Sequence, residues 1–207
     1  MRLTASDFAS CYRPTRCDLR VFLRHQQEQG AEPGPYDIVL RRLGLRHERD
    51  HLATLGTFVN VSAVSLEEQV KKTSDSIEAK VPVLYQPAFL AIERLCGTDV
   101  EIVGVPDYLI LDGDRYVIQD SKMARRIDEE NHPEIVLQVQ LYGWLFEKSC
   151  GTAPKGLQVH AGTGDVVTIP YDAGAAALRE LVRLLAIKRL TAEPHEPVGW
   201  TKCLGCP

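Results

Sequence analysis

The chain alternates between stretches whose apolar residues recur at helical spacing and stretches rich in β-branched and aromatic residues. The helical stretches begin at residues that cap helices well or at proline. They predict a short helix capped by Ser6 and interrupted by Pro14, one capped by Thr15, one at about 36–55, one starting at Ser65, one at about 133–148 and one capped by Asp172. The polar, glycine- and proline-containing stretch at 26–35 predicts a surface loop.

The strands are predicted where valine, isoleucine and aromatic residues are concentrated. They fall at 81–85, 88–93, 100–111, 116–120, 156–161 and 166–169. Gly97 and the pair Asp112-Gly113 are turn signals between neighbouring strands. We therefore expect the first four strands to follow one another as hairpins.

This order of elements is typical of an α/β fold, with a central mixed sheet flanked by helices. The 207 residues, 44% hydrophobic and 25% charged, fit a single domain covering residues 1–207. We expect a helical N-terminal segment at 1–25, a core at 36–190 and a C-terminal cysteine segment at 191–207.

The composition limits the location and the partners of the protein. No stretch is apolar over the ~20 residues that a membrane-spanning helix needs, and the N-terminus has no apolar signal-peptide region. We therefore expect a cytoplasmic protein with no membrane partner, whose six cysteines are not explained by disulfides. The net charge of -4 does not suggest a nucleic-acid-binding protein, but acidic metal ligands can make the total negative while one face stays basic.

Two carboxylates and a lysine occur in two strands that we expect to pair. Asp107 follows Pro106 in one strand, and Asp120 and Lys122 lie at the end of the next. Alternation along a strand places Asp120 and Lys122 on one face, and Asp107 can face them across the hairpin. Converging carboxylates suit Mg²⁺ or Mn²⁺. A lysine beside such a metal can position or deprotonate a water and offset charge on a phosphorane.

The predicted helix at 133–148 places Gln138 one turn from Tyr142 on an otherwise apolar stripe, where an amide needs a hydrogen-bond partner. With the carboxylate and lysine motifs before it, this Q-x-x-x-Y pattern resembles the RecB-like branch of the PD-(D/E)xK nucleases. Asp120 stands where many members have glutamate. The resemblance implies a restriction-endonuclease-like core, a metal-dependent DNA nuclease and a catalytic set of Asp107, Asp120, Lys122, Gln138 and Tyr142.

A histidine before the sheet extends the resemblance. The segment at 44–48 is similar to the family's G-x-x-H-E element, so His47 is implied as a third metal ligand beside Asp107 and Asp120. A nitrogen ligand favours Mn²⁺ more than an all-oxygen site does. The same helix also matches the zinc-protease motif H-E-x-x-H through His47, Glu48 and His51, although no further zinc ligand stands out downstream. A zinc protease and a non-catalytic nucleic-acid-binding module are the alternative functions.

The cysteines at the two ends of the chain suggest a second site. Cys203 and Cys206 form a C-x-x-C pair, which serves zinc and iron–sulfur clusters equally well. Cys17 begins a C-x-x-R-x-x-L element that resembles the first-ligand segment of RecB-like nucleases with a [4Fe–4S] cluster. The resemblance implies a structural cluster on Cys17, Cys203 and Cys206, with Zn²⁺ as the competing occupant.

One cluster ligand is missing from the set that the family carries. Either the sequence is a fragment or Cys11 replaces the missing ligand, and we favour a fragment because Cys11 and Cys17 lie on opposite sides of Pro14. Cys96 and Cys150 lie beside glycines near element ends and are expected to be ordinary buried thiols.

Arginines at regular spacing are candidates for phosphate contacts. Arg16, Arg20 and Arg24 share one face of the predicted N-terminal helix, and Arg125 and Arg126 follow the lysine motif. Each phosphate that an arginine neutralises would add salt-dependent affinity for nucleic acid. The common alternative is that these arginines form a face exposed to solvent. Arg20 could instead stabilise the fold around the cluster.

The family resemblance also implies a biological setting. The segment at 82–86, after an amphipathic helix, is similar to RecB-family nucleases that precede helicase domains, and CRISPR-associated RecB-like exonucleases share the motifs. We expect hydrolysis of DNA at single-stranded ends, as an exonuclease rather than an endonuclease, in DNA repair, recombination or CRISPR-type processing. A fused or associated helicase is the expected protein partner.

Overall fold

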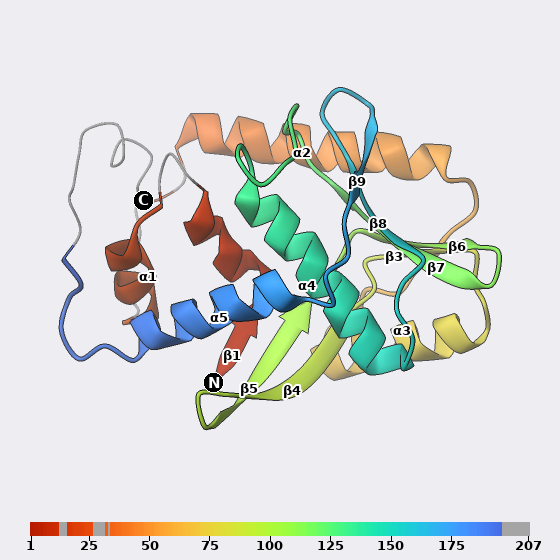
Figure 1. The fold of residues 1–207 in the computed structure, drawn as a ribbon. Coiled ribbons are helices and arrows are strands. Elements are labelled where there is room, and N and C mark those ends of the chain that lie inside the picture. Colours follow the sequence, from red (N-terminus) through yellow and green to blue (C-terminus); the bar gives the residue numbers. More distant parts are fainter. Residues whose placement is uncertain (13–15, 27–31, 33, 196–207) are drawn as a thin grey trace.

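The computed structural model describes residues 1–12, 16–26, 32 and 34–195, whose arrangement is drawn in Figure 1. The helices are η1 (Ala5–Cys11, a 3-10 helix), α1 (Asp18–His25), α2 (Pro35–Thr54), α3 (Leu66–Glu78), α4 (Pro133–Cys150) and α5 (Ala175–Lys188). The strands are β1 (Arg2–Thr4), β2 (Val59–Asn60), β3 (Val83–Tyr85), β4 (Phe89–Leu95), β5 (Thr98–Gly104), β6 (Tyr108–Asp112), β7 (Arg115–Ser121), β8 (Gly156–His160) and β9 (Val166–Ile169). No described helix is long and apolar enough to cross a membrane.

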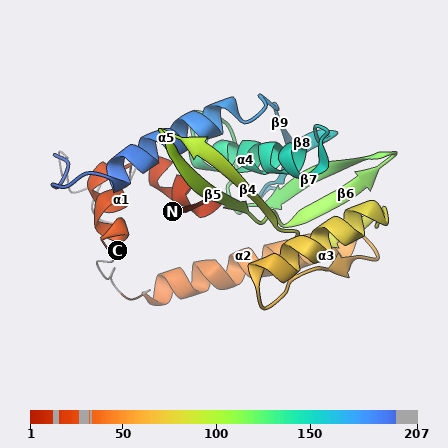
Figure 2. The same ribbon diagram turned by 90° about the horizontal axis from the view of Figure 1, so that it is seen from below.

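The strands form two sheets instead of the single central sheet expected. The smaller sheet has the order β1-β5-β4 and the larger the order β2-β3-β6-β7-β8-β9. Each mixes orientations, because β1-β5, β2-β3 and β7-β8 are parallel pairs and the other neighbours are antiparallel. Figure 2 shows α2 and α3 on one side of the strands and α4 and α5 on the other. The protein therefore has an α/β fold with mixed sheets flanked by helices.

The strand expected at 100–111 is in fact two strands, β5 and β6, which belong to different sheets. The chain leaves β5 after Gly104 and bends at Asp107. Pro106 lies in this break, where it removes a backbone N–H and restricts the residue before it. The hairpins β4-β5 and β6-β7 are confirmed, but the expected β3-β4 hairpin is wrong because β3 pairs with β6.

The predicted helix starts hold for α2, α3 and α4. Ser65 Oγ accepts a hydrogen bond from the backbone N–H of Glu68 at 3.2 Å, as an N-cap should. Ser6 is not a cap, because η1 starts earlier and Asp7 Oδ2 accepts from the N–H of Thr4. Helix α5 begins after the expected position, although Asp172 Oδ2 still accepts from a first-turn N–H. Thr15 lies outside the described residues.

Helix α4 is the centre of the core. Val139 and Leu145 on this helix, Ile118 on β7, Leu157 on β8 and Leu181 on α5 are all fully buried. Burial of this apolar surface stabilises the contact of α4 with both the sheet and α5. As a result, the side of β7 that carries Asp120 faces α4.

Candidate active site

The carboxylates of Asp107 and Asp120 lie side by side at one end of the β6-β7 hairpin. The ladder ends with Tyr108 opposite Gln119, so one further step along both strands brings Asp107 opposite Asp120. Two hydrogen bonds fix the pair: the N–H of Ser121 donates to Asp107 Oδ2 at 2.7 Å, and the N–H of Asp107 lies 3.4 Å from Asp120 Oδ1. The structure therefore brings together the two acids predicted from the sequence.

Burial raises the free-energy cost of keeping both carboxylates ionised. Asp120 is 1% exposed. Burial and the neighbouring charge of Asp120 raise the pKa of Asp107 well above its ordinary value, and the cation of Lys122 offsets only part of this effect. Carboxylates whose pKa is raised by burial and by a neighbouring acid are typical of functional sites. Two such carboxylates can lie side by side only if a cation or a proton offsets their charge.

Lys122 supplies one such cation. Its Nζ lies 2.5 Å from Asp120 Oδ2, and its backbone N–H donates to the carbonyl of His160 at 2.9 Å, which anchors the chain just past β7. Burial lowers the pKa of Lys122, but Asp120 and Asp107 outweigh that effect and the net shift is upward. In the absence of a metal, Lys122 is therefore a protonated ammonium group.

Gln138 and Tyr142 on α4 are also brought to the site. Gln138 Nε2 donates to the Tyr142 hydroxyl at 2.6 Å, the one-turn contact that the spacing predicts. Burial raises the pKa of Tyr142 well above its ordinary value, and the charges of Asp120 and Asp107 add to the shift. Tyr142 thus lies near the acids as a neutral phenol, while Gln138 lines the cavity next to Lys122.

Helix α2 reaches the acids through Glu48. Glu48 Oε1 accepts hydrogen bonds from the Tyr85 hydroxyl at 2.7 Å and from Gln86 Nε2 at 3.1 Å. The same Gln86 amide lies 3.2 Å from Asp107 Oδ1, so it bridges the two carboxylates. The charge of Glu48 also contributes to the raised pKa of Asp107.

His47 takes a different position from the one predicted. Its ring stacks on His160 with centroids 4.5 Å apart, and His51 stacks on His160 at 3.7 Å. Ring nitrogens lie in the ring plane, so stacked rings do not point at one another, and His47 Nε2 lies 3.4 Å from the backbone carbonyl oxygen of His160. Among the described residues, no group of three His, Cys, Asp or Glu side chains is arranged to hold a metal. His47 therefore does not complete a preassembled site with Asp107 and Asp120, and the zinc-protease motif is not assembled either.

One histidine of this stack, His160, has a lowered pKa. Burial lowers the pKa of His160 to about 4, and the neighbouring His51 and His47 add to the effect. His51 Nε2 hydrogen-bonds Gln119 Oε1, which requires that Nε2 carry the proton. The Gln119 amide donates in turn to Gln158 Oε1 at 3.0 Å. This buried chain connects α2 to β7 and β8 directly behind the acids.

The sequence motifs do not reveal the residues that support the acids. They contain Glu48 but give it no contact with the acids, and they give no role to Gln86 or Gln119. A signal is present for Gln119, which is a polar residue within an apolar strand and is only 3% exposed. No sequence signal predicts the contacts of Gln86, because they depend on the pairing of β3 with β6.

Of the three cysteines expected to bind the cluster, only Cys17 lies within the described residues. Cys17 is the residue before α1 and is half-buried, whereas Cys203 and Cys206 lie outside the described residues. Cys11 donates to Glu180 Oε1 at 2.9 Å, and burial, together with this contact, raises its pKa to about 12. Cys96 is exposed at the β4-β5 turn, so its prediction as a buried thiol is wrong.

The predicted phosphate-binding arginines separate into groups. Arg20 and Arg24 line the same polar hollow beside α1, and Arg20 also lines a larger cavity next to Lys122. Arg16 is exposed, and its charge acts on Glu180. Arg125 and Arg126 are exposed on the segment between β7 and α4.

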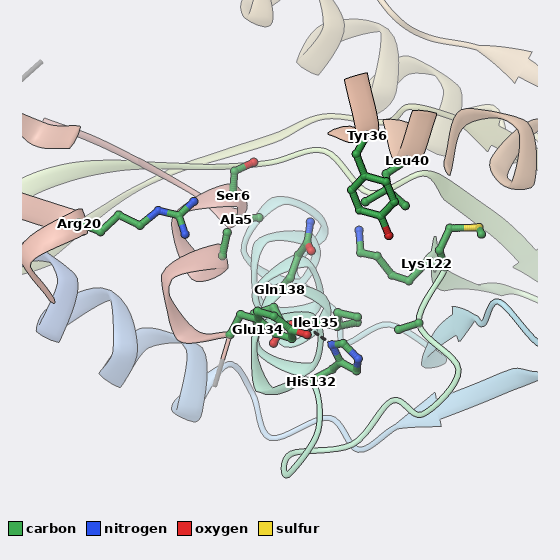
Figure 3. A pocket seen from close by; sticks show the side chains of 14 residues that line it. Ala5, Ser6, Arg20, Tyr36, Leu40, Lys122, His132, Glu134, Ile135 and Gln138 are labelled. Carbon is green, nitrogen blue, oxygen red and sulfur yellow. Dashed lines mark hydrogen bonds and ion pairs between the residues drawn. The ribbon is translucent and has the colours of Figure 1, made fainter. Parts of the chain in front are cut away.

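The larger cavity has a volume of about 810 Å³. Figure 3 shows Lys122 and Arg20 at its two ends with Gln138 between them, while Tyr36 and Leu40 project from α2. The acids and the cavity are thus connected through Lys122. A ligand in the cavity would lie next to the ammonium group that contacts Asp120.

Comparisons with known proteins identify no family. No protein-family model matches the sequence, and no curated protein is similar to it. Among solved structures, the chain is similar to the one described as "Crystal structure of SSO0001", with a TM-score of 0.43 and 14% identity over 90% of this chain and 76% of that chain.

Proposed function

We propose that the protein is a divalent-metal-dependent nuclease with a PD-(D/E)xK core that hydrolyses phosphodiester bonds of DNA at single-stranded ends. The observation that carries the proposal is the buried pair Asp107 and Asp120 with the Lys122 ammonium 2.5 Å from Asp120. Two adjacent carboxylates and a lysine at the end of one hairpin are the donor set that phosphodiester hydrolysis with a hard cation needs.

The residues fit Mg²⁺ or Mn²⁺. Asp120 Oδ2 is buried without a hydrogen-bond partner apart from its ion pair with Lys122, and Asp107 has a pKa raised by burial and by Asp120. Both features describe anionic oxygens that a divalent cation would stabilise. Asp107 and Asp120 are the protein ligands that this geometry supports, because no third His, Cys, Asp or Glu of the described residues is arranged with them to hold a metal.

Each residue then has a role in hydrolysis. A bound Mg²⁺ or Mn²⁺ supplies Lewis-acid chemistry and lowers the pKa of a coordinated water. Lys122, protonated beside the acids, is positioned to stabilise negative charge on the attacked phosphate. Gln86 and Ser121 hold the carboxylate of Asp107 in place, and Gln138, oriented by Tyr142, offers its amide to the substrate side.

The test is cleavage of labelled single-stranded and duplex DNA with Mn²⁺, Mg²⁺ or EDTA. We expect cleavage that requires the metal and a loss of at least about 100-fold in kcat for Asp107→Asn, Asp120→Asn and Lys122→Met, the scale of a lost charge-stabilising group. Asp114→Asn in the exposed β6-β7 turn is the matched control and should cleave normally. Full cleavage in EDTA, or by the Asp120→Asn variant, would rule out this site.

The alternatives predict other outcomes in the same preparation. A zinc protease would hydrolyse peptide substrates and lose that activity in His51→Ala. A non-catalytic binding module would retain DNA affinity and show no cleavage with any metal. The geometry disfavours the protease because His51 is hydrogen-bonded to Gln119 and Glu48 to Tyr85 and Gln86.

The structural [4Fe–4S] cluster on Cys17, Cys203 and Cys206 is part of the proposal, with Zn²⁺ as its alternative. Cys11 would have to give up its hydrogen bond to Glu180 Oε1, at 2.9 Å, to serve as the fourth ligand. Visible absorption and iron content of the anaerobically purified full chain test this cofactor. Cys17→Ala should lower both, together with the thermal stability, and Cys96→Ala should change neither.

A further inference from the structure

The cavity beside Lys122 is large enough for one nucleotide. Its volume of about 810 Å³ lies within the range of pockets for small organic ligands. It lies between η1, α2 and α4, and its lining includes Ala9, Tyr12, Tyr36, Leu40, Met123 and Ile135. These side chains make much of the cavity wall apolar, while Lys122 and Arg20 lie at its two ends with Gln138 and Glu134 between them (Figure 3).

The walls offer flat aromatic surfaces. Tyr12 stacks on His132 with ring centroids 5.5 Å apart and an angle of 15° between the planes. On the opposite wall, Tyr36 is 72% exposed and Leu40 is 47% exposed, although both lie on the stripe of α2 that faces the cavity. Apolar and aromatic side chains on an inward stripe are normally covered. Here they border the cavity, which suits a flat apolar group such as a nucleobase.

A second hollow continues from the first. It has a volume of about 410 Å³ and shares Ser6 and Arg20 with the larger cavity. Arg24, His25 and Lys188 line it together with Asp7, which pairs with Lys188 at 2.7 Å, so the two arginines are the basic groups along which a strand could continue. Arg20 and Arg24 are one helical turn apart on α1 and present their charges along one line. The two hollows form a path with apolar side chains next to Lys122 and with Arg20 and Arg24 farther away.

We propose that this path binds a single nucleic-acid strand, with one unpaired nucleobase in the aromatic cavity and the following phosphates at Arg20 and Arg24. The proposal rests on the proposed nuclease function, which identifies the ligand as a nucleic acid. It adds a structural reason why the site would select a single strand over a duplex. A base in a duplex exposes only its edges, because both faces are stacked on neighbours. An unpaired base exposes the faces that Tyr36 and the Tyr12-His132 pair would contact.

Binding can be measured without cleavage. The probe is a short single-stranded DNA carrying 2-aminopurine as its terminal base, titrated with the full chain in EDTA, so that stacking is read as quenching of fluorescence. We expect Tyr36→Ala to weaken binding by about tenfold, the size of one lost stack, and to abolish the quenching. Ile92→Ala is the matched control, because Ile92 is similarly exposed, at 69%, on β4.

The phosphate part of the path has its own test. Arg24→Gln should weaken binding of every sequence to the same extent and reduce the dependence of log Kd on log salt concentration by about one unit. Arg94→Gln, at the β4-β5 hairpin end and paired with Asp99, should leave that slope unchanged. An unchanged slope in Arg24→Gln would overturn this assignment.

The experiment separates the two proposals. Metal-dependent cleavage that survives Tyr36→Ala and Tyr12→Leu unchanged, with normal quenching, would refute the base pocket and leave the nuclease intact. Quenching by native protein without cleavage in Mn²⁺ would refute the nuclease and support the pocket. If Tyr36→Ala converts a dimer to a monomer and leaves DNA binding intact, α2 is covered by a second copy and the base pocket is wrong.

Discussion

The side-chain amide of Gln86 lies 3.2 Å from Asp107 Oδ1 and connects this acid to Glu48 on α2. Gln86 has a backbone φ of 58°, in the left-handed region, and its N–H donates to the carbonyl of Asp107 at 2.8 Å. Its carbonyl accepts from the Gln69 side chain at 2.7 Å. A non-glycine residue held in this conformation next to an acid pair indicates that its side chain has a positioning role.

Replacing Gln86 tests this role. Gln86→Gly accommodates the positive φ but removes the amide, so Asp107 loses its orienting partner. We expect cleavage to fall by about 10- to 100-fold, the scale found for residues that orient metal ligands, with little loss of thermal stability. Lys80→Gly is the control, because Lys80 also has a positive φ, of 54°, and lies at the end of α3 away from the acids. Equal cleavage by both variants would mean that Gln86 is purely structural.

Asp107 should destabilise the metal-free fold at neutral pH. Its pKa is raised in the folded state, so it favours folding only when protonated, and that contribution is lost as pH rises from about 4 through the raised pKa. Asp107→Asn should therefore have a higher Tm than the native protein at pH 8 in EDTA, and the difference should shrink at pH 4. Adding Mn²⁺ should raise the Tm of the native protein only. Asp114→Asn, measured in parallel, should show none of these effects.

His160 should make stability fall in weak acid. Its folded pKa of about 4 lies below the ordinary value of 6.5, so the unfolded chain takes up the proton first and stability declines as pH falls from 6.5 to 4. His160→Phe keeps an aromatic ring in the stack and removes the titrating group. We expect the free energy of unfolding of this variant to depend less steeply on pH in that window, measured by urea denaturation. His25→Gln, at an exposed position, should follow the native curve.

Gly104 allows α4 to approach the end of β5. A Cβ at this position would lie 2.6 Å from Leu145 and 2.7 Å from Tyr142, both in the core. Gly104→Ala should cost about 1–3 kcal/mol of unfolding free energy, as overpacking does, and should reduce cleavage by displacing Tyr142. Gly156→Ala is matched, because Gly156 is also a strand residue and a Cβ there meets nothing within 4 Å. Similar stability of the two variants in chemical denaturation would contradict this packing argument.

Local patterns in the sequence were sufficient for many elements. The helices α3 and α4 follow from apolar spacing and from starts at serine or proline, and the β6-β7 hairpin follows from its Asp112-Gly113 turn. Because pairing in a short hairpin is set by the turn, the proximity of Asp107 and Asp120 follows from the sequence alone. The contact of Gln138 with Tyr142 follows in the same way from helical spacing.

Tertiary structure decided everything that depends on distant pairing. Pro106 is a local sign that the apolar stretch at 100–111 is interrupted. No local signal states that β3 pairs with β6 or that the two halves of this stretch join different sheets, because both outcomes depend on which surfaces α4 covers. The orientation of α2 against the sheet likewise directs Glu48 toward Gln86 and Asp107, and His47 toward His160. Helical spacing puts these neighbouring residues on different faces, and only packing selects the face that meets the acids. The sequence by itself thus determined the acid pair and its lysine, and the tertiary structure determined which side chains surround them.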